Sequence, residues 1–132
     1  MRTQLTTVSL RRLLAADGYL QFQLPHRAIA ELEKTGPAGP LEGPRQLLWG
    51  IALNQSDHAM QAIPHLEQAA RLLPPTARCC AWHELEYAYR KVGSEELAEL
   101  AHTLAGEHSI DIRPQLLQTP YRADLSGNLR HT

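Results

Sequence analysis

The sequence predicts an all-α fold, and two observations lead to this prediction. Apolar residues recur at helical spacing in several segments, and clusters of proline and glycine separate these segments. In addition, one series of small and large apolar residues occurs three times at a nearly constant interval. The chain has 132 residues, of which 43% are hydrophobic, so it is long enough for one domain with a buried core.

The recurring series is clearest in residues 43–76. After Gly50 it reads Leu53, Ala62, Leu66, Ala69 and Pro74. A shift of 34 residues toward the N-terminus, with Thr35 as a departure, gives Ala16, Tyr19, Ala28, Leu32 and Pro40. A shift of 36 residues toward the C-terminus, with Glu86 and His102 as departures, gives Tyr89, Ala98 and Ala105. The longer second step indicates a two-residue insertion within 74–78.

This register of small, large and proline residues resembles the tetratricopeptide repeat. The third copy opens with Trp82, Leu85 and Tyr89 at the spacing of that family's Trp-x-x-Leu-Gly-x-x-Tyr opening, with Glu86 in place of the small residue. The resemblance implies a right-handed superhelical stack of three antiparallel helix pairs, over 9–42, 43–76 and 79–112. It leaves a lead-in over 1–8 and a C-terminal tail over 113–132 that is poorly ordered or folded back.

Breakers and capping residues predict where the helices begin and end. Pro25 is expected in the first turn of a helix that ends near Thr35, and Gly93 is expected to cap the helix before Ser94. The first helices of the three pairs are expected over 9–22, 43–54 and 77–91.

The second helix of the middle pair contains an anomaly. Ser56 or Asp57 can cap this helix. If the helix begins at Asp57, Pro64 removes one internal hydrogen bond and should kink it. A late helix start is the alternative.

The last predicted helix has an apolar face that no further repeat covers. This face comprises Leu97, Leu100, Ala101 and Leu104. Three possibilities are open: exposure to solvent, self-association through the last helix pair into a homo-oligomer, or coverage by the tail residues Leu116, Leu117, Tyr121 and Leu125.

In tetratricopeptide repeats, the first helices of the pairs line a concave groove that binds other proteins. Carried onto this sequence, the groove positions are Leu13, Asp17, Gln21, Leu47, Ile51, Asn54, Gln55, His83, Glu84, Tyr87, Arg90 and Lys91. An apolar groove with one polar end would suit an amphipathic helix or an apolar segment of a partner, with Tyr87 and Arg90 as anchors. Alternatively, Leu13, Leu14, Leu47 and Leu48 are buried between neighbouring repeats.

Composition excludes several classes of protein. The net charge of -1 argues against a nucleic-acid binder that neutralises phosphates. No apolar run approaches the ~18 residues of a membrane span, and the N-terminus has no apolar stretch typical of a secretion signal. The adjacent Cys79 and Cys80 are expected to be reduced thiols of a cytoplasmic protein.

The function predicted from these features is that of a non-enzymatic protein-interaction module, an adaptor or assembly scaffold without a cofactor. A small dedicated chaperone that shields an apolar segment of one client is the alternative. A metal or thiol enzyme using Cys80, His83 and His102 is a remote alternative, because no second ligand pair completes a zinc pattern.

Overall fold

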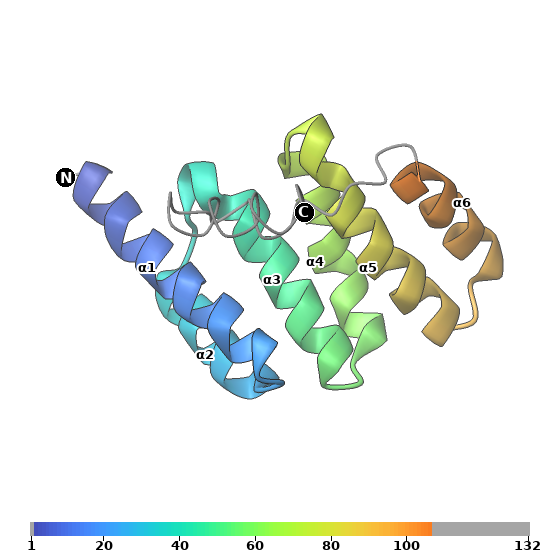
Figure 1. Cartoon of the computed structure of the whole chain (residues 1–132), viewed down its shortest axis with the longest axis horizontal. Coiled ribbons are helices and arrows are strands. Elements are labelled where there is room, and N and C mark those ends of the chain that lie inside the picture. Colours follow the sequence, from blue (N-terminus) through green and yellow to red (C-terminus); the bar gives the residue numbers. More distant parts are fainter. Residues whose placement is uncertain (1, 107–132) are drawn as a thin grey trace, which may run out of the picture.

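The computed structural model describes residues 2–106, with side chains from Thr7 onward. In this part the chain forms six α-helices and two short 3₁₀-helices and no strand, which confirms the all-α prediction there (Figure 1). Residues 107–112 of the third predicted repeat and the tail over 113–132 lie outside the described residues. The elements are α1 (Arg2–Gln21), α2 (Pro25–Thr35), η1 (Gly39–Leu41), α3 (Glu42–Gln55), α4 (Ala59–Leu72), η2 (Pro75–Ala77), α5 (Arg78–Lys91) and α6 (Glu95–Gly106).

The helices pack in the order in which they occur along the chain. Helix α1 contacts α2, α3 contacts α4 and α5 contacts α6, while contacts of α2 with α3 and of α4 with α5 join neighbouring pairs. Contacts of α1 with α3 and of α3 with α5 place these three helices side by side in one layer, with α2 and α4 behind it (Figure 1). Each helix is therefore packed against its neighbours in sequence.

The same turn ends the first helix of every pair. One residue of each turn has a positive φ: 59° at Gln23, 65° at Asp57 and 86° at Gly93. In each turn the amide of the next residue donates to the carbonyl five positions earlier at 2.8 Å, from Leu24 to Tyr19, from His58 to Leu53 and from Ser94 to Tyr89. This pattern is the Schellman motif, and it confirms Gly93 as a C-terminal cap. The turns recur at the same intervals as the apolar series in the sequence.

Two helices begin at positions other than those first considered. Helix α1 begins at Arg2 rather than near Ser9, so residues 2–8 of the predicted lead-in are helical. No proline or glycine precedes Ser9, and a helix that has already formed extends readily through such a segment. Helix α4 begins at Ala59 rather than at Asp57, and no side chain caps its N-terminus.

Ser56 serves the preceding helix instead of capping the following one. Its Oγ donates to the carbonyl oxygens of Ala52 at 3.0 Å and Leu53 at 3.2 Å, at the C-terminus of α3. Helix α4 remains continuous from Ala59 to Leu72 across Pro64. This late start is the alternative that the sequence left open to a helix beginning at Asp57. It places Pro64 closer to the N-terminus of α4.

The core contains the residues that the recurring series identified. The small residues of the series are fully buried, as expected where two helices approach closely. Leu32 and Leu66 are fully buried too, and Tyr19 is half-buried. The buried small residues are Ala28, Ala62, Ala69, Ala98 and Ala105.

A polar cluster at the start of α3 joins the first pair to the second. The Glu42 carboxylate accepts hydrogen bonds from the Ala38 amide at 2.9 Å, from Arg45 at 3.0 Å and from Gln46 at 2.7 Å. Arg45 also donates through Nε to the carbonyl of Leu32 in α2 at 3.1 Å. Partial burial raises the pKa of Glu42, but these hydrogen bonds and the Arg45 charge outweigh it and lower the pKa.

His65 on α4 completes this cluster. Its ring stacks on Trp49 at a centroid separation of 4.9 Å, and the Arg45 guanidinium lies 4.9 Å from the Trp49 ring centroid. His65 Nδ1 lies 2.7 Å from Gln46 Oε1. Burial, together with the Arg45 charge, lowers the pKa of His65.

Candidate interaction surface

A pocket of about 410 Å³ lies where the C-terminal parts of α3 and α5 meet the turn after α1. Five of its six lining residues belong to the predicted groove set, and Gln23 is the sixth. The lining residues are Gln23, Ile51, Asn54, Gln55, Glu84 and Tyr87.

Two side-chain amides hold the three helices together beside this pocket. Asn54 Nδ2 donates to the Glu84 carbonyl at 3.2 Å and to Glu84 Oε1 at 3.0 Å, which joins α3 to α5. Gln55 Nε2 donates to the Leu20 carbonyl at 3.1 Å, which joins α3 to α1. Two successive residues at the end of α3 thus bond to different helices, Asn54 to α5 and Gln55 to α1. These hydrogen bonds fix the helices that form the walls of the pocket.

Each of these amides has an oxygen without a donor among the described residues. Asn54 Oδ1 and Gln55 Oε1 are both buried and receive no hydrogen bond there. Asn54 is only 6% exposed. Almost none of the surface of either oxygen is accessible, so both belong to the packed contacts between the helices rather than to the open part of the pocket.

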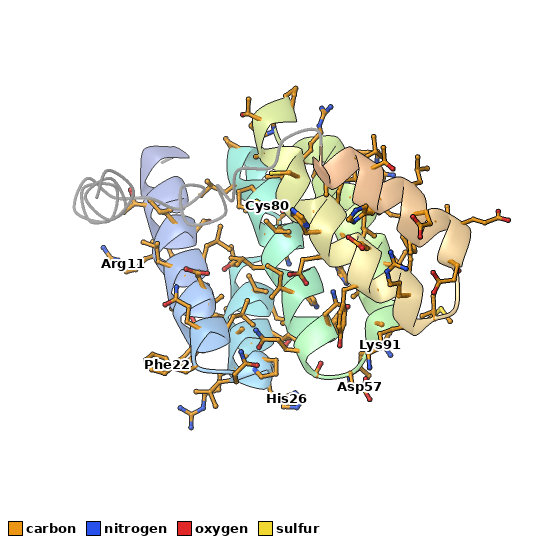
Figure 2. The ribbon with its side chains drawn as sticks, turned by 45° about the vertical axis from the view of Figure 1, so that its right-hand side comes forward. Arg11, Phe22, His26, Asp57, Cys80 and Lys91 are labelled. Carbon is orange, nitrogen blue, oxygen red and sulfur yellow. The ribbon has the colours of Figure 1, made fainter. Side chains whose placement is uncertain are left out.

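Tyr87 is the aromatic residue of the pocket. It is 45% exposed, whereas Ile51 on the facing helix is 3% exposed. The Lys91 ammonium lies 5.7 Å from the Tyr87 ring centroid, a cation–π arrangement. Lys91 lies at the end of the molecule where Phe22, His26 and Asp57 also lie (Figure 2). Of the six side chains that line the pocket, four are polar or charged, and Tyr87 is its one aromatic ring.

The predicted apolar part of the groove belongs to the core. Leu13 is 0% exposed and Leu47 is 1% exposed, and Leu48 is buried with them. The alternative prediction, that these leucines are buried, therefore holds for all three. Leu14 is partly buried against the same core. The reason is the close approach of α1, α3 and α5, which covers the faces that the sequence left open.

The other predicted groove residues lie outside the pocket. Asp17 is buried and accepts a hydrogen bond from Gln21 Nε2 at 3.0 Å, while His83 is exposed. Arg90 is directed to the glutamates of its own helix and of α6, with Glu86 at 3.1 Å and Glu95 at 2.8 Å. Of the two expected anchors, only Tyr87 lines the pocket.

Sequence reasoning did not identify Gln23 as a pocket residue. The groove positions were taken only from helices, and Gln23 lies in the turn after α1 with a positive φ. A signal was nonetheless present, because Gln23 precedes Asp57 by the same 34 residues that separate the copies of the series. That spacing predicts an equivalent backbone position, but it does not predict that the side chain reaches α3 and α5.

The residues of the remote metal or thiol alternative do not form a common cluster. Cys80 is buried near the end of α5 that is distant from Lys91 (Figure 2), whereas His102 Nδ1 lies 3.2 Å from Glu86 Oε1. Within residues 2–106, no three His, Cys, Asp or Glu residues form a group that could hold a metal ion. In the same part of the chain, no helix is both long enough and apolar enough to cross a membrane.

Comparison of this chain with protein-family models, with curated proteins and with solved structures finds no match. The resemblance to tetratricopeptide repeats therefore remains a prediction from the apolar series. The chemistry of the pocket is inferred from its own residues.

Proposed function

We propose that this chain is a non-enzymatic protein-interaction module, an adaptor or scaffold, that binds a partner segment across the layer of α1, α3 and α5. The observation that carries this proposal is the pocket between α3 and α5, in which the exposed Tyr87 ring lies beside the polar side chains of Asn54, Gln55 and Glu84. Tyrosine is enriched among interface residues that contribute most to binding.

We also propose that the helix pairs stack as tetratricopeptide-like repeats in a right-handed superhelix. Two observations support this arrangement. The Schellman turns at Gln23, Asp57 and Gly93 recur at the intervals of the apolar series. Each helix pair also contacts the next pair through both of its helices, as in stacked repeats.

The polar lining changes the kind of partner that fits this surface. An apolar segment would need open apolar side chains, but Leu13, Leu47 and Ile51 are at most 3% exposed. The chaperone alternative depends on such side chains, so the surface favours an adaptor that binds a polar segment. Tyr87 would then contribute most of the apolar contact.

Site-specific photo-crosslinking tests this function. A photoreactive phenylalanine analogue replaces Tyr87 in one variant and Met60, which is 69% exposed on α4, in the control. A discrete partner crosslinked from cells at position 87 and not at position 60 is expected. Binding of that partner should also be weakened by Tyr87→Ala and unchanged by Met60→Ala. Equal crosslinking at both positions, or none at position 87, would refute the proposed surface.

A further inference from the structure

A second pocket, of about 300 Å³, lies where α6 meets the C-terminal part of α4, the 3₁₀-helix η2 and the start of α5. None of its lining residues belongs to the pocket between α3 and α5, so the two pockets are separate surfaces. Trp82 and Leu104 form an apolar part of the second pocket, and Arg71 and Arg78 form a charged part.

The two arginines of this pocket have no acidic partner among the described residues. Arg78 donates through Nε to the Leu73 carbonyl at 3.0 Å, and Arg71 donates to a glutamine side chain of its own helix. Neither forms an ion pair within residues 7–106. The Glu67 carboxylate also lines the pocket, where it accepts a hydrogen bond from the Tyr89 hydroxyl at 2.7 Å. Two guanidinium groups and one carboxylate leave a net positive charge, so an acidic group fits the pocket.

An exposed apolar strip on α6 begins at this pocket. Leu104 lines the pocket, and Leu100 and Leu97 precede it at helical spacing on the same face. Leu100 is 55% exposed and Leu97 is 47% exposed. Because removal of leucine side chains from water is favourable, this strip is suited to contact with another protein surface.

The other end of the strip carries an acidic residue. Glu96 is exposed and lies one turn before Leu100, on the same face of α6. The other two glutamates of α6 are directed to Arg90, Glu95 at 2.8 Å and Glu99 at 3.8 Å. Glu96 forms no ion pair in the part of the chain that the structure describes. The strip therefore has a carboxylate without a cation at one end and arginines without an acidic partner at the other.

This arrangement makes the face complementary to a copy of itself. In an antiparallel pair of α6 helices that meet at Leu100, position 96 of each helix faces position 104 of the other. Glu96 of one copy then reaches the pocket that Leu104, Arg71 and Arg78 line in the other copy. A parallel pair would instead place like charges beside each other, at the glutamates and at the arginines, which is unfavourable.

We infer that this face binds a second copy of the chain in a two-fold symmetric dimer, with α6 antiparallel to α6. The leucine strips cover each other, and each Glu96 pairs with the Arg71 and Arg78 guanidinium groups of the other copy. A two-fold axis forms both contacts at once, because the same patch is present on both copies. The dimer uses a face distinct from the pocket of Tyr87, and it does not depend on the partner proposed for that pocket.

Sedimentation equilibrium of the full chain with exchanged charges tests the dimer. Glu96→Arg and Arg71→Glu should each weaken it about tenfold, because each variant places like charges together at two symmetric contacts. An equimolar mixture of the two variants should associate more tightly than either variant alone, since opposite charges meet again in the mixed dimer. Glu33→Arg and Arg27→Glu, at exposed positions of α2, are the matched controls and should associate as wild type does.

Three results of this experiment would overturn the inference. They are a wild type that is monomeric at every concentration, charge variants that associate as wild type does, and a mixture that associates no more tightly than its components. Tyr87→Ala should leave the dimer unchanged, so failure of the dimer and failure of the proposed interaction surface are distinguishable.

Disulfide formation tests the position of the two-fold axis. Leu100→Cys places the new thiols of the two copies opposite each other, so oxidation should link the copies through position 100. Ala30→Cys is the control, because Ala30 is exposed at the equivalent position of α2. The native Cys79 and Cys80 are buried. A Leu100→Cys variant that links no faster than Ala30→Cys would overturn the inference, and it would indicate a head-to-tail contact or another occupant of this face.

Discussion

Gly50 on α3 and Leu66 on α4 occupy the same space between the helices of the middle pair. A Cβ atom at Gly50 would overlap both Cγ and Cδ2 of Leu66, and Leu66 is fully buried. Both residues belong to the apolar series from which the sequence predicted this helix pair. Gly50 is its first small residue and Leu66 is its second large one. The missing side chain at one position therefore makes room for the leucine at the other.

Gly50→Ala should lower the free energy of unfolding by about 1–3 kcal/mol, because the added methyl group overpacks the α3–α4 contact. Urea denaturation measures this effect. Gly18→Ala is the matched control, since a Cβ there meets nothing within 4 Å and alanine is the better residue inside a helix, with a gain of about 1 kcal/mol. Similar effects of the two substitutions would contradict the close contact between Gly50 and Leu66. Leu66→Ala should reduce the cost of Gly50→Ala in a double-mutant cycle.

At the positive-φ residue of each Schellman turn, the effect of glycine on the free energy of unfolding should depend on the residue that it replaces. Gln23 has a φ of 59°, a conformation that costs an ordinary L-residue about 1–2 kcal/mol, so Gln23→Gly should raise the free energy of unfolding by about 1 kcal/mol. Asp57→Gly should gain less, since aspartate tolerates this conformation better. Gly93→Ala should instead cost about 1 kcal/mol. Thermal unfolding of the three variants tests the order, and a stabilising Gly93→Ala would contradict it.

The polar cluster around Glu42 and His65 predicts loss of stability in acid. His65 has a folded-state pKa below 6.5, so its stabilising contribution is present above pH 6.5 and is lost as the pH falls through the folded-state value. Glu42 has a folded-state pKa below 4.5, and its contribution is lost at still lower pH. Protonation of His65 places a second cation near Arg45, and protonation of Glu42 removes an acceptor of three hydrogen bonds.

Denaturation at a series of pH values tests this order of events. His65→Phe keeps an aromatic ring opposite Trp49 but cannot be protonated, so the variant should lose the dependence of stability just below pH 6.5. Its loss of stability at lower pH, where Glu42 is protonated, should remain. His58→Phe is the control, because His58 is exposed outside this cluster. A His65→Phe variant with the wild-type pH profile would show that His65 does not contribute.

The exposed face of α6 predicts self-association. Leu97 is 47% exposed and Leu100 is 55% exposed, and Leu104 lies on the same face at helical spacing. Sedimentation velocity should show concentration-dependent association of the full chain, since contiguous apolar surface favours contact between copies. Leu97→Lys with Leu100→Lys should suppress it while changing stability by no more than about 0.5 kcal/mol. Met60→Lys, at an exposed position of α4, should have no effect, and a wild type that is monomeric at every concentration would contradict this role of α6.

The sequence predicted most of the helical architecture, because that architecture depends on local signals. Pro25 begins α2 and Gly93 caps α5 as expected, since their backbone preferences act within one turn of helix. The start of α1 at Arg2 was not predicted, because a polar segment without breakers gives no signal for either helix or coil. Ser56, one of two candidates to cap α4, instead bonds to the end of α3, since the same hydroxyl can bond to the end of one helix or to the start of the next.

By itself, the sequence determined the register: the buried alanines at Ala28, Ala62 and Ala98 recur because two helices can approach closely only at small residues. Only the tertiary structure decided which positions of the predicted groove remain accessible. Helical spacing predicts the helix face on which Leu47 or Tyr87 lies, but it does not predict how much of that face a neighbouring helix covers. The contacts of α3 with α1 and α5 bury Leu47 and leave Tyr87 open beside Asn54, because burial depends on the distance between helices that are far apart in sequence.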